Sequence, residues 1–409
     1  MTTSYKCRSC NAKGLVQFLD LGSQPLANNL LGKADLHKSE PKFPLCLAVC
    51  PSCHLVQITE TVPPVDLFED YLYFSSFSDA MLRHAASAVT GYIAEYELDT
   101  KSFVTEIASN DGYLLKNFVA AGVPCLGVEP AKNVARVAEE AGVPTLCEFF
   151  GVKTAKDVAA RHGKADLILG NNVFAHAPDI NDFIGGIAIL LKDGGRAALE
   201  FPYLGDFIAN LEFDTTYHEH IFYFSVLALK PAFERHGLEI HDVARLPIHG
   251  GSLRLFVGKK GAHPVTPAPA KMIEEERNDG LDGLPAYEAF ADRIRDLKRK
   301  LVDLIASLKS EGKSVAAYGA SAKGSTLLNY FGISGDSLDF IVDRSTYKQG
   351  KFTPGTHLEI LPAEELLARN PDYTLLLTWN FAEEILAQQS AYREAGGKFI
   401  VPLPEPHIV

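Results

Sequence analysis

The stretch between residues 76 and 262 alternates short apolar runs with segments whose apolar residues recur at helical spacing. Short apolar runs bounded by turn residues are typical of buried strands, and their alternation with helices predicts a parallel sheet covered on both faces. We therefore predict an α/β fold. The expected parallel strands are Phe103–Ile107, Pro124–Glu129, Pro144–Cys147, Ala165–Asn171 and Gly195–Phe201.

The end of this stretch has a different pattern. A helical segment at Ser225–His236 precedes two apolar runs, Leu238–Leu246 and Gly251–Val257, which are joined by a short connection. A short connection cannot cross over a sheet, so these runs are expected to pair antiparallel. Five parallel strands and a terminal hairpin make a seven-stranded order that is typical of methyltransferases using S-adenosylmethionine (SAM). A nicotinamide dehydrogenase would more often continue with parallel crossovers.

The C-terminal part predicts a second, Rossmann-like α/β domain. Three prolines within Gly258–Pro269 indicate a linker, and a long amphipathic helix follows it. Packing of this helix across a neighbouring domain is favoured over coiled-coil dimerisation, and the chain is expected to be a monomer or a homodimer. The helix carries Phe290, Ile294, Leu297, Leu301, Leu304 and Leu308 on one face. The expected strands are Val315–Ala320, Leu338–Val342, Tyr373–Thr378 and Phe399–Val401.

We divide the 409 residues into a small zinc-binding domain at 1–75, a methyltransferase domain at 76–262 and a Rossmann-like domain at 263–409. The net charge is -12, and without a basic patch such a surface argues against nucleic acid as a partner. No apolar run is long enough for a membrane span and the first residues lack a signal-peptide core, so a cytoplasmic protein is expected.

The cysteines at the N-terminus change this picture most. Cys7 and Cys10 form one C-x-x-C pair, and Cys50 and Cys53 form another. In a reducing compartment two such pairs favour a structural zinc ion, which would stabilise a unit too small for a large core. Four sulfur ligands leave no open position for catalysis. Cys46 is an alternative to Cys50, although its spacing fits less well.

The loop after the first predicted strand, Glu106-Ile107-Ala108-Ser109-Asn110-Asp111-Gly112, is the candidate cofactor loop. Its small residues allow a ligand to approach the backbone, but it lacks the G-x-G-x-x-G that a pyrophosphate requires. Glu129 ends the second strand, where a carboxylate can accept hydrogen bonds from ribose hydroxyls. The loop and this carboxylate together favour SAM. The predicted cofactor residues are Glu106, Ala108, Ser109, Asn110, Gly112, Glu129, Pro130, Phe149, Asn171 and Asn172.

Three candidates at this edge of the sheet have ordinary structural alternatives, and for Glu129 the alternative is a solvated strand end before Pro130. Phe149 follows the third strand and could stack on adenine, although core packing explains it almost as well. Asn171 and Asn172 end the fourth strand, at the sheet edge where open α/β sheets bind ligands. His176, a little further on, is a candidate substrate contact, with helix capping or packing as the alternative.

Tyr217-His218-Glu219-His220 is the candidate catalytic cluster, because four polar groups beside an aromatic run are costly to bury without a function. If the segment is extended, His218 and His220 share one face, and Tyr217 and Glu219 share the other. Histidine can remove a proton from a carbon that a neighbouring carbonyl acidifies, and a tyrosine hydroxyl can donate to the enolate oxygen. A metal site or a structural polar cluster is the alternative.

A third cluster, Tyr318-Gly319-Ala320-Ser321-Ala322-Lys323-Gly324-Ser325-Thr326, joins a strand to a helix in the last domain. Its amides, its hydroxyl and its lysine suit a pyrophosphate, so Ser321 and Lys323 are predicted to bind substrate. An ordinary strand–helix turn is the alternative. His249, beside two glycines, is a weaker candidate for substrate contact.

These motifs, together with the Leu21–Asn28 and Cys50–Gln57 stretches, resemble the sugar-nucleotide C-methyltransferases of deoxysugar pathways, and among them the C-3′-methyltransferases of the tetronitrose pathway. The resemblance covers essentially the whole chain. It implies SAM as cofactor, a zinc domain, and a dTDP-linked 4-keto-6-deoxysugar as substrate, bound between the last two domains. It also implies that His220 is the general base, assisted by Tyr217 and Glu219, and that Tyr71 approaches the same site.

Three other functions compete with C-3′ methylation. C-5 methylation or O-methylation of a related sugar nucleotide would use a similar site, since a histidine base also serves a hydroxyl. A sugar-nucleotide epimerase or oxidoreductase should show G-x-G-x-x-G and a Tyr-x-x-x-Lys couple, and neither is convincing here.

One departure from the commonest methyltransferase loop is Ala108, where glycine is more usual; it narrows the loop slightly.

Overall fold

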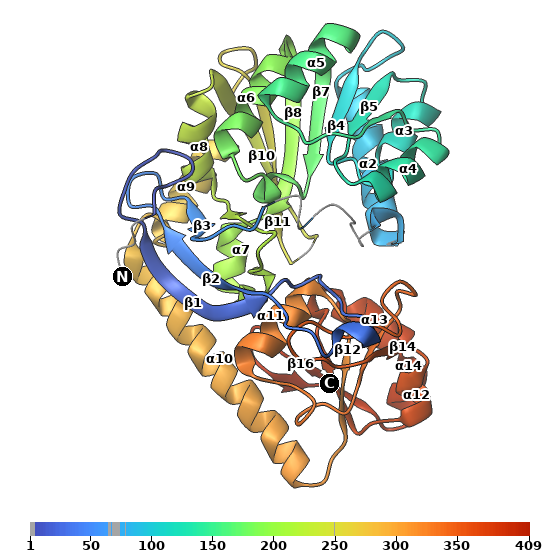
Figure 1. Cartoon of the computed structure of the whole chain (residues 1–409). Helices are drawn as coiled ribbons and strands as arrows, with labels where there is room; N and C mark the ends of the chain where they lie inside the picture. Colours follow the sequence, from blue (N-terminus) through green and yellow to red (C-terminus); the bar gives the residue numbers. More distant parts are fainter. Residues whose placement is uncertain (1–4, 64–66, 68–73, 78, 249) are drawn as a thin grey trace.

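The computed structural model describes the whole chain except residues 1–4, 64–66, 68–73, 78 and 249. It contains a four-stranded, a seven-stranded and a six-stranded sheet. Figure 1 shows the first sheet (blue) beside the junction between the central α/β unit (cyan to green) and the C-terminal α/β unit (orange to red). The expected fold class is confirmed.

The N-terminal sheet has the strand order β1-β2-β3-β9 and is antiparallel throughout. Its strands are β1 (Val16–Pro25), β2 (Lys42–Val49), β3 (Val56–Ile58) and β9 (Phe222–Tyr223), and η1 (Lys33–Asp35) lies between β1 and β2. Strand β9 belongs to the aromatic run after Tyr217–His220, so the zinc-domain sheet holds the segment that follows the candidate catalytic cluster.

The central sheet has the order β10-β11-β8-β7-β4-β5-β6, in which only β10 and β11 run antiparallel to their neighbours. The parallel strands are β4 (Val104–Ile107), β5 (Cys125–Val128), β6 (Thr145–Leu146), β7 (Ala165–Asn171) and β8 (Leu191–Pro202), and the hairpin is β10 (Leu238–Leu246) and β11 (Ser252–Lys259). The five parallel strands and the terminal hairpin are confirmed.

Helices cover both faces of this sheet (Figure 1). They are α2 (Asp79–Glu95), α3 (Leu115–Ala120), α4 (Lys132–Glu140), α5 (Val152–His162), α6 (Ile180–Leu190) and α8 (Val226–Glu234), whereas α7 (Leu204–Ala209) lies beyond the carboxyl end of β8, beside β2. Three short turns, η2 (Ser75–Phe77), η3 (Phe174–His176) and η4 (Phe213–Thr215), lie in loops at the candidate site.

The C-terminal sheet has the order β14-β13-β12-β15-β16-β17, parallel except for the last strand. Its strands are β12 (Val315–Tyr318), β13 (Ile341–Asp343), β14 (Ile360–Pro362), β15 (Tyr373–Leu376), β16 (Lys398–Val401) and β17 (His407–Ile408). Around it lie α11 (Ala322–Phe331), α12 (Glu365–Arg369), η5 (Trp379–Phe381), α13 (Ala382–Gln388) and α14 (Ser390–Glu394). The sequence pattern missed β14 and β17, because strands of two or three residues carry too little periodicity.

Helices α9 (Ala268–Asn278) and α10 (Leu284–Ser310) follow the linker, and α10 runs from the N-terminal sheet to the C-terminal unit (Figure 1). The ring of Tyr287 lies 4.9 Å from that of Phe18 in β1, and the ring of Phe290 lies 4.9 Å from that of Phe207 in α7. The apolar face of α10 therefore packs on this chain's own units, as expected. The domain boundaries after residues 75 and 262 stay a prediction.

Within the described residues, no helix combines the length and the apolar character that crossing a bilayer requires.

Candidate active site and zinc centre

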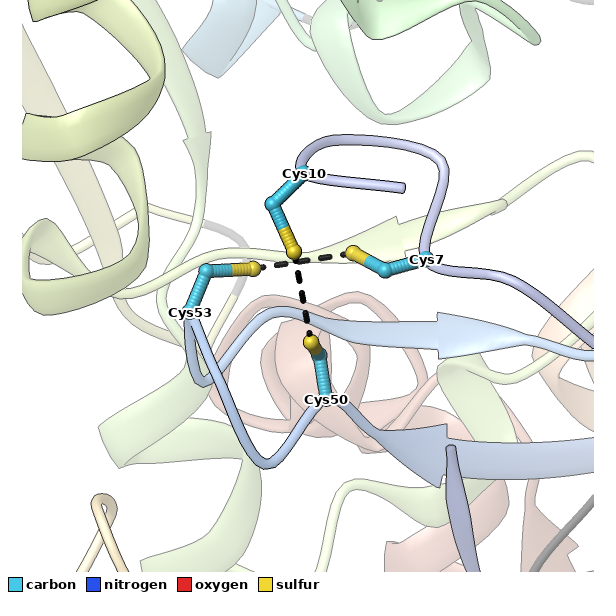
Figure 2. A group of neighbouring side chains, drawn as sticks. All are labelled: Cys7, Cys10, Cys50 and Cys53. Carbon is cyan, nitrogen blue, oxygen red and sulfur yellow. Dashed lines mark hydrogen bonds between the residues drawn. The ribbon is translucent and has the colours of Figure 1, made fainter. Parts of the chain in front are cut away.

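Two tight turns bring the four cysteines of the C-x-x-C pairs into one cluster (Figure 2). Their sulfur atoms all lie within 4.8 Å of one another, with 3.5 Å between Cys7 and Cys53 and 3.6 Å between Cys10 and Cys50. Four thiolates at about 2.3 Å from one zinc ion would be about 3.8 Å apart, so the cluster fits tetrahedral zinc. None of the four forms a disulfide.

The two turns have the same backbone construction. The amide of Asn11 donates to the carbonyl of Cys7, and the amide of His54 donates to the carbonyl of Cys50, both at 2.9 Å. Asn11 and His54 also share the left-handed conformation, with φ of 61° and 60°. Such a turn closes each C-x-x-C pair, so that both thiols of a pair face the same point.

Neighbouring groups support the cluster and exclude the alternative ligand. The side chain of Gln57 donates to the sulfur of Cys7 at 3.4 Å, which is the contact expected around a thiolate ligand. Cys46 lies outside the cluster and donates its thiol to Asp20 at 3.3 Å. The alternative with Cys46 in place of Cys50 is therefore wrong, because β2 directs Cys46 toward β1.

The candidate cofactor loop after β4 has an unusual backbone. Ala108, Asn110 and Gly112 have φ of 53°, 50° and 76°. The left-handed region is disfavoured for residues with a Cβ, and such strain concentrates at ligand-binding loops. At Gly112 a Cβ would lie 2.9 Å from the side chain of Val143, so this position also requires glycine sterically.

Glu129 follows β5 and binds this loop from the neighbouring strand. Its two carboxylate oxygens accept hydrogen bonds from the amides of Asn110 and Ala131, each at 2.9 Å. Pro130 has no N–H, so the amide of Ala131 is the first donor that follows Glu129. Burial raises the pKa of Glu129. Because a carboxylate oxygen accepts more than one hydrogen bond, Glu129 can still receive ribose hydroxyls, and the loop fits an adenosine group.

Two further polar groups are buried beside this loop. Glu106 is 1% exposed, and its Oε2 has no hydrogen-bond partner among the described residues. Burial raises the pKa of Glu106 well above its ordinary value, and the charge of Glu129 adds to the effect. Ser109 Oγ also lacks a partner there, and a Cβ on Gly127 would lie 2.2 Å from it.

The remaining predicted cofactor residues lie at the same edge of the sheet. Asn171 ends β7, and Asn172 after it has a φ of 54° and a buried Oδ1 without a partner in the described part of the chain. Phe149 follows β6 and is 49% exposed. An aromatic ring that exposed is not packed in the core, so the stacking interpretation is favoured over the packing one.

The candidate catalytic cluster forms a turn between η4 and β9. The Nδ1 atom of His220 lies 2.9 Å from the carbonyl oxygen of Thr215, which can only accept, so Nδ1 carries the proton. In the neutral ring Nε2 is then the basic nitrogen, and the hydroxyl of Tyr217 lies 2.8 Å from it. The backbone thus selects the histidine tautomer that general-base chemistry needs.

The segment is not extended, so the condition under which His218 and His220 would share a face is not met. The amide of His220 donates to the carbonyl of Tyr217 at 2.9 Å, which folds the four residues into a turn. His218 consequently faces the zinc domain, with its ring 5.8 Å from that of Phe43, whereas the ring of His220 lies 4.0 Å from that of Tyr217. In a turn, side chains do not alternate between two faces as they do in a strand, so His218 and His220 point in different directions.

Two buried neighbours complete the surroundings of His220. Glu219 accepts a hydrogen bond from Asn28 at 2.6 Å, and burial raises the pKa of Glu219 to about 7. The ring of His176 lies 4.8 Å from the ring of His220. Burial lowers the pKa of His176 to about 4, so His176 is neutral at physiological pH.

The loop after β12 places Ser321 at the N-cap of α11, where its hydroxyl accepts from the amide of Gly324 at 3.0 Å. A small pocket lies here, lined by the loop and by Ala27 and Leu30 of the N-terminal unit. The ammonium group of Lys323 is buried in the protein and has no hydrogen-bond partner among the described residues.

Tyr71 and His249 lie outside the described residues. The amides of Ser75 and Ser76 donate to the side chains of Asn110 and Asp111 in the candidate cofactor loop, at 2.9 and 3.1 Å.

Sequence reasoning did not assign Thr215 or Asn28 to the site. Thr215 contributes only a backbone carbonyl, which no side-chain pattern reveals, and Asn28 meets Glu219 across 191 residues of chain.

Comparison with known proteins identifies the family. The model described as "C-methyltransferase C-terminal domain" matches residues 247–404, "Putative zinc binding domain" matches 7–68, and "Methyltransferase domain" matches 81–243. The C-methyltransferase NovU of Streptomyces niveus is 38% identical over 405 residues, which cover 99% of this chain and 96% of NovU. The chain belongs to the C-methyltransferase family. It is a SAM-dependent enzyme with a zinc site in its N-terminal unit.

Solved methyltransferase structures are more distant. Magnesium protoporphyrin IX methyltransferase of Synechocystis PCC 6803 with bound SAM is 15% identical, with a TM-score of 0.34 over 44% of this chain and 79% of that chain. The complex of the Haloferax volcanii Trm112 activator with a methyltransferase gives the same identity and TM-score, and covers 44% of this chain and 94% of that one. At these TM-scores the likenesses add nothing to the assignment of this C-methyltransferase.

Proposed function

We propose that this C-methyltransferase transfers a methyl group from SAM to C-3′ of a dTDP-linked 4-keto-6-deoxysugar, including sugars that lack the 2-hydroxyl. One observation carries the proposal: His220 presents a basic Nε2 next to a tyrosine hydroxyl, in a tautomer fixed by the carbonyl of Thr215. Carbon becomes nucleophilic only after a proton is removed beside a carbonyl, and this pair of groups suits that reaction.

In the proposed reaction His220 Nε2 takes the proton from C-3, and the C–H electrons form the enolate. Tyr217 donates a hydrogen bond to the enolate oxygen while the charge develops. Glu219, held by Asn28, positions the turn from its other side. SAM would supply the electrophilic methyl group: the enolate carbon bonds to it as the bond between methyl and sulfur breaks, and S-adenosylhomocysteine leaves.

The residues proposed to bind the cofactor lie in and around the loop after β4. Glu129 would accept the ribose hydroxyls, and the strained loop at Ala108–Gly112 would allow close approach of the cofactor. Asn171 and Asn172 would contact its amino-acid part, and Phe149 its adenine. Ser321 and the amides at the start of α11 would bind the diphosphate, because a helix N-terminus favours anions. His176, His249 and Tyr71 stay candidate contacts with the sugar.

The test is mass spectrometry, together with proton NMR spectroscopy of the product, after dTDP-4-keto-2,6-dideoxyglucose is incubated with the enzyme and methyl-deuterated SAM. We expect the labelled methyl group on the product and loss of the C-3 proton to solvent. A labelled product that retains the C-3 proton would indicate C-5 methylation or O-methylation instead. No labelled product, from enzyme that binds SAM and zinc, would refute the proposed substrate.

A further inference from the structure

The C-terminal sheet contains a topological switch point. The chain runs from β12 outward to β13 and β14, then returns to the other side of β12 for β15 and β16. Open α/β sheets bind ligands outside the carboxyl ends of the two strands at such a point. Here the residues after β12 and β15 are close together, because a Cβ on Gly319 would lie 2.7 Å from the hydroxyl of Thr378.

Five residues gather at this place, and we call them the switch-point cluster: Glu212, Asp214, Lys323, Thr378 and Trp379. The ammonium group of Lys323 lies 4.7 Å from the centre of the Trp379 ring, and the indole N–H of Trp379 donates to Asp214 Oδ2 at 2.7 Å. The C-terminal domain supplies Lys323, Thr378 and Trp379, whereas Glu212 lies at the N-cap of η4 and Asp214 lies within η4.

Several polar atoms of this cluster are buried without a hydrogen-bond partner among the described residues: Lys323 Nζ, Asp214 Oδ1 and Thr378 Oγ1. Asp214 is 0% exposed. A buried polar group that makes no hydrogen bond destabilises the folded protein, and a charged one does so more strongly. A donor, an acceptor and a hydroxyl in this state point to a ligand that both accepts and donates hydrogen bonds.

The charges in the cluster argue against a diphosphate at Lys323. Burial raises the pKa of Glu212 to about 7 and that of Asp214 to about 6, and Lys323 opposes both shifts. Both acidic groups lie close enough to Lys323, the cation of the cluster, for its charge to lower their pKa against the effect of burial. With a pKa of about 6, Asp214 is still mostly ionised at neutral pH, and it would repel a diphosphate, which only accepts hydrogen bonds and carries further negative charge. A neutral ring with hydroxyl and carbonyl groups would satisfy both Lys323 and Asp214.

We propose that the switch-point cluster is the subsite for the hexosyl ring of the sugar nucleotide. Lys323 donates to an oxygen substituent of the ring, Asp214 Oδ1 accepts a hydrogen bond from a ring hydroxyl, and Trp379 positions both groups. The inference rests on the proposed sugar-nucleotide substrate and moves Lys323 from the diphosphate to the sugar. Asp214 is directly followed by Thr215, whose carbonyl orients His220, so the subsite adjoins the proposed base.

The test compares two probes, dTDP and dTDP-glucose, by isothermal titration calorimetry on the full chain. Lys323→Met and Asp214→Asn should each raise the dissociation constant of dTDP-glucose by about tenfold or more, because a hydrogen bond to a charged group is lost. The same variants should change the dissociation constant of dTDP by less than about twofold. Lys313→Met is the matched control: this lysine pairs with Asp372 at 3.4 Å, at the opposite end of the sheet, and its loss should affect neither probe.

Folding of each variant is checked by its affinity for S-adenosylhomocysteine. If Lys323→Met or Asp214→Asn loses that affinity, the isosteric Thr378→Val replaces it in the comparison, and it too should weaken only dTDP-glucose. Equal weakening of both probes by Lys323→Met would place this lysine at the diphosphate and overturn the subsite. Unchanged binding of dTDP-glucose by the folded variants would also overturn it. A wild-type enzyme that binds neither probe would refute the proposed substrate together with the subsite.

Discussion

Replacement of His220 by asparagine tests the proposed base most directly. The structure gives His220 two contacts, Nδ1 with the carbonyl of Thr215 at 2.9 Å and Nε2 with the hydroxyl of Tyr217 at 2.8 Å. Asparagine keeps a polar side chain but has no basic nitrogen. Loss of a general base lowers turnover by about 10²- to 10⁴-fold, which corresponds to about 2.7–5.5 kcal/mol of transition-state free energy.

The assay follows two rates: methyl transfer from SAM, and exchange of the C-3 proton with D₂O. Both should fall in His220→Asn, whereas the affinity for S-adenosylhomocysteine should stay unchanged, because the cofactor loop lies on other strands. His218→Asn is the matched control, since His218 lies in the same turn but faces Phe43 of the zinc domain. Turnover by His220→Asn within about tenfold of wild type would refute the general-base assignment.

Three further predictions concern the zinc cluster, the cofactor loop and pH. Cys53→Ser should lose zinc, measured by plasma emission spectrometry, and lower the melting temperature, whereas Cys46→Ser should keep the metal because Cys46 lies outside the cluster. Glu129→Gln should weaken S-adenosylhomocysteine by about 10- to 100-fold in calorimetry, because a charged acceptor is lost; an unchanged affinity would exclude Glu129 from the ribose site. The pKa of Glu219 is about 7 in the folded protein and ordinarily 4.5, so the folded state binds more protons and stability falls as pH rises through this window. Glu219→Gln should therefore stabilise the protein by about 3 kcal/mol at pH 8 and by little at pH 5 in urea unfolding, and equal effects at both pH values would contradict the shift.

Local patterns in the sequence predicted much of the architecture. The strands Ala165–Asn171 and Leu238–Leu246 have the expected bounds, because long apolar runs between turn residues report burial directly. The zinc cluster could also be predicted from the sequence, since each C-x-x-C pair forms its own local turn. The loop before Gly112 was predicted as a ligand loop from small residues alone, although the left-handed backbone at Ala108 was not foreseen.

The tertiary structure decided how the site is assembled. An extended segment would place His218 and His220 on one face. A turn separates them instead, because the amide of His220 donates a hydrogen bond to the carbonyl of Tyr217. Pairing of β9 with β3 joins the zinc domain to the segment after His220, and Asn28 reaches Glu219 from far along the chain.

The switch-point cluster arose in the same way, from the meeting of two domains at Asp214 and Trp379. The spacing of residues along the chain reflects the requirements of local structure, namely those of helices, strands and metal-binding turns. It does not record which distant groups become neighbours when the domains pack, since that depends on the burial of whole surfaces. The sequence by itself therefore predicted the α/β fold, the four clustered cysteines and the candidate cofactor loop, and only packing decided the tautomer of His220 and the surroundings of Lys323.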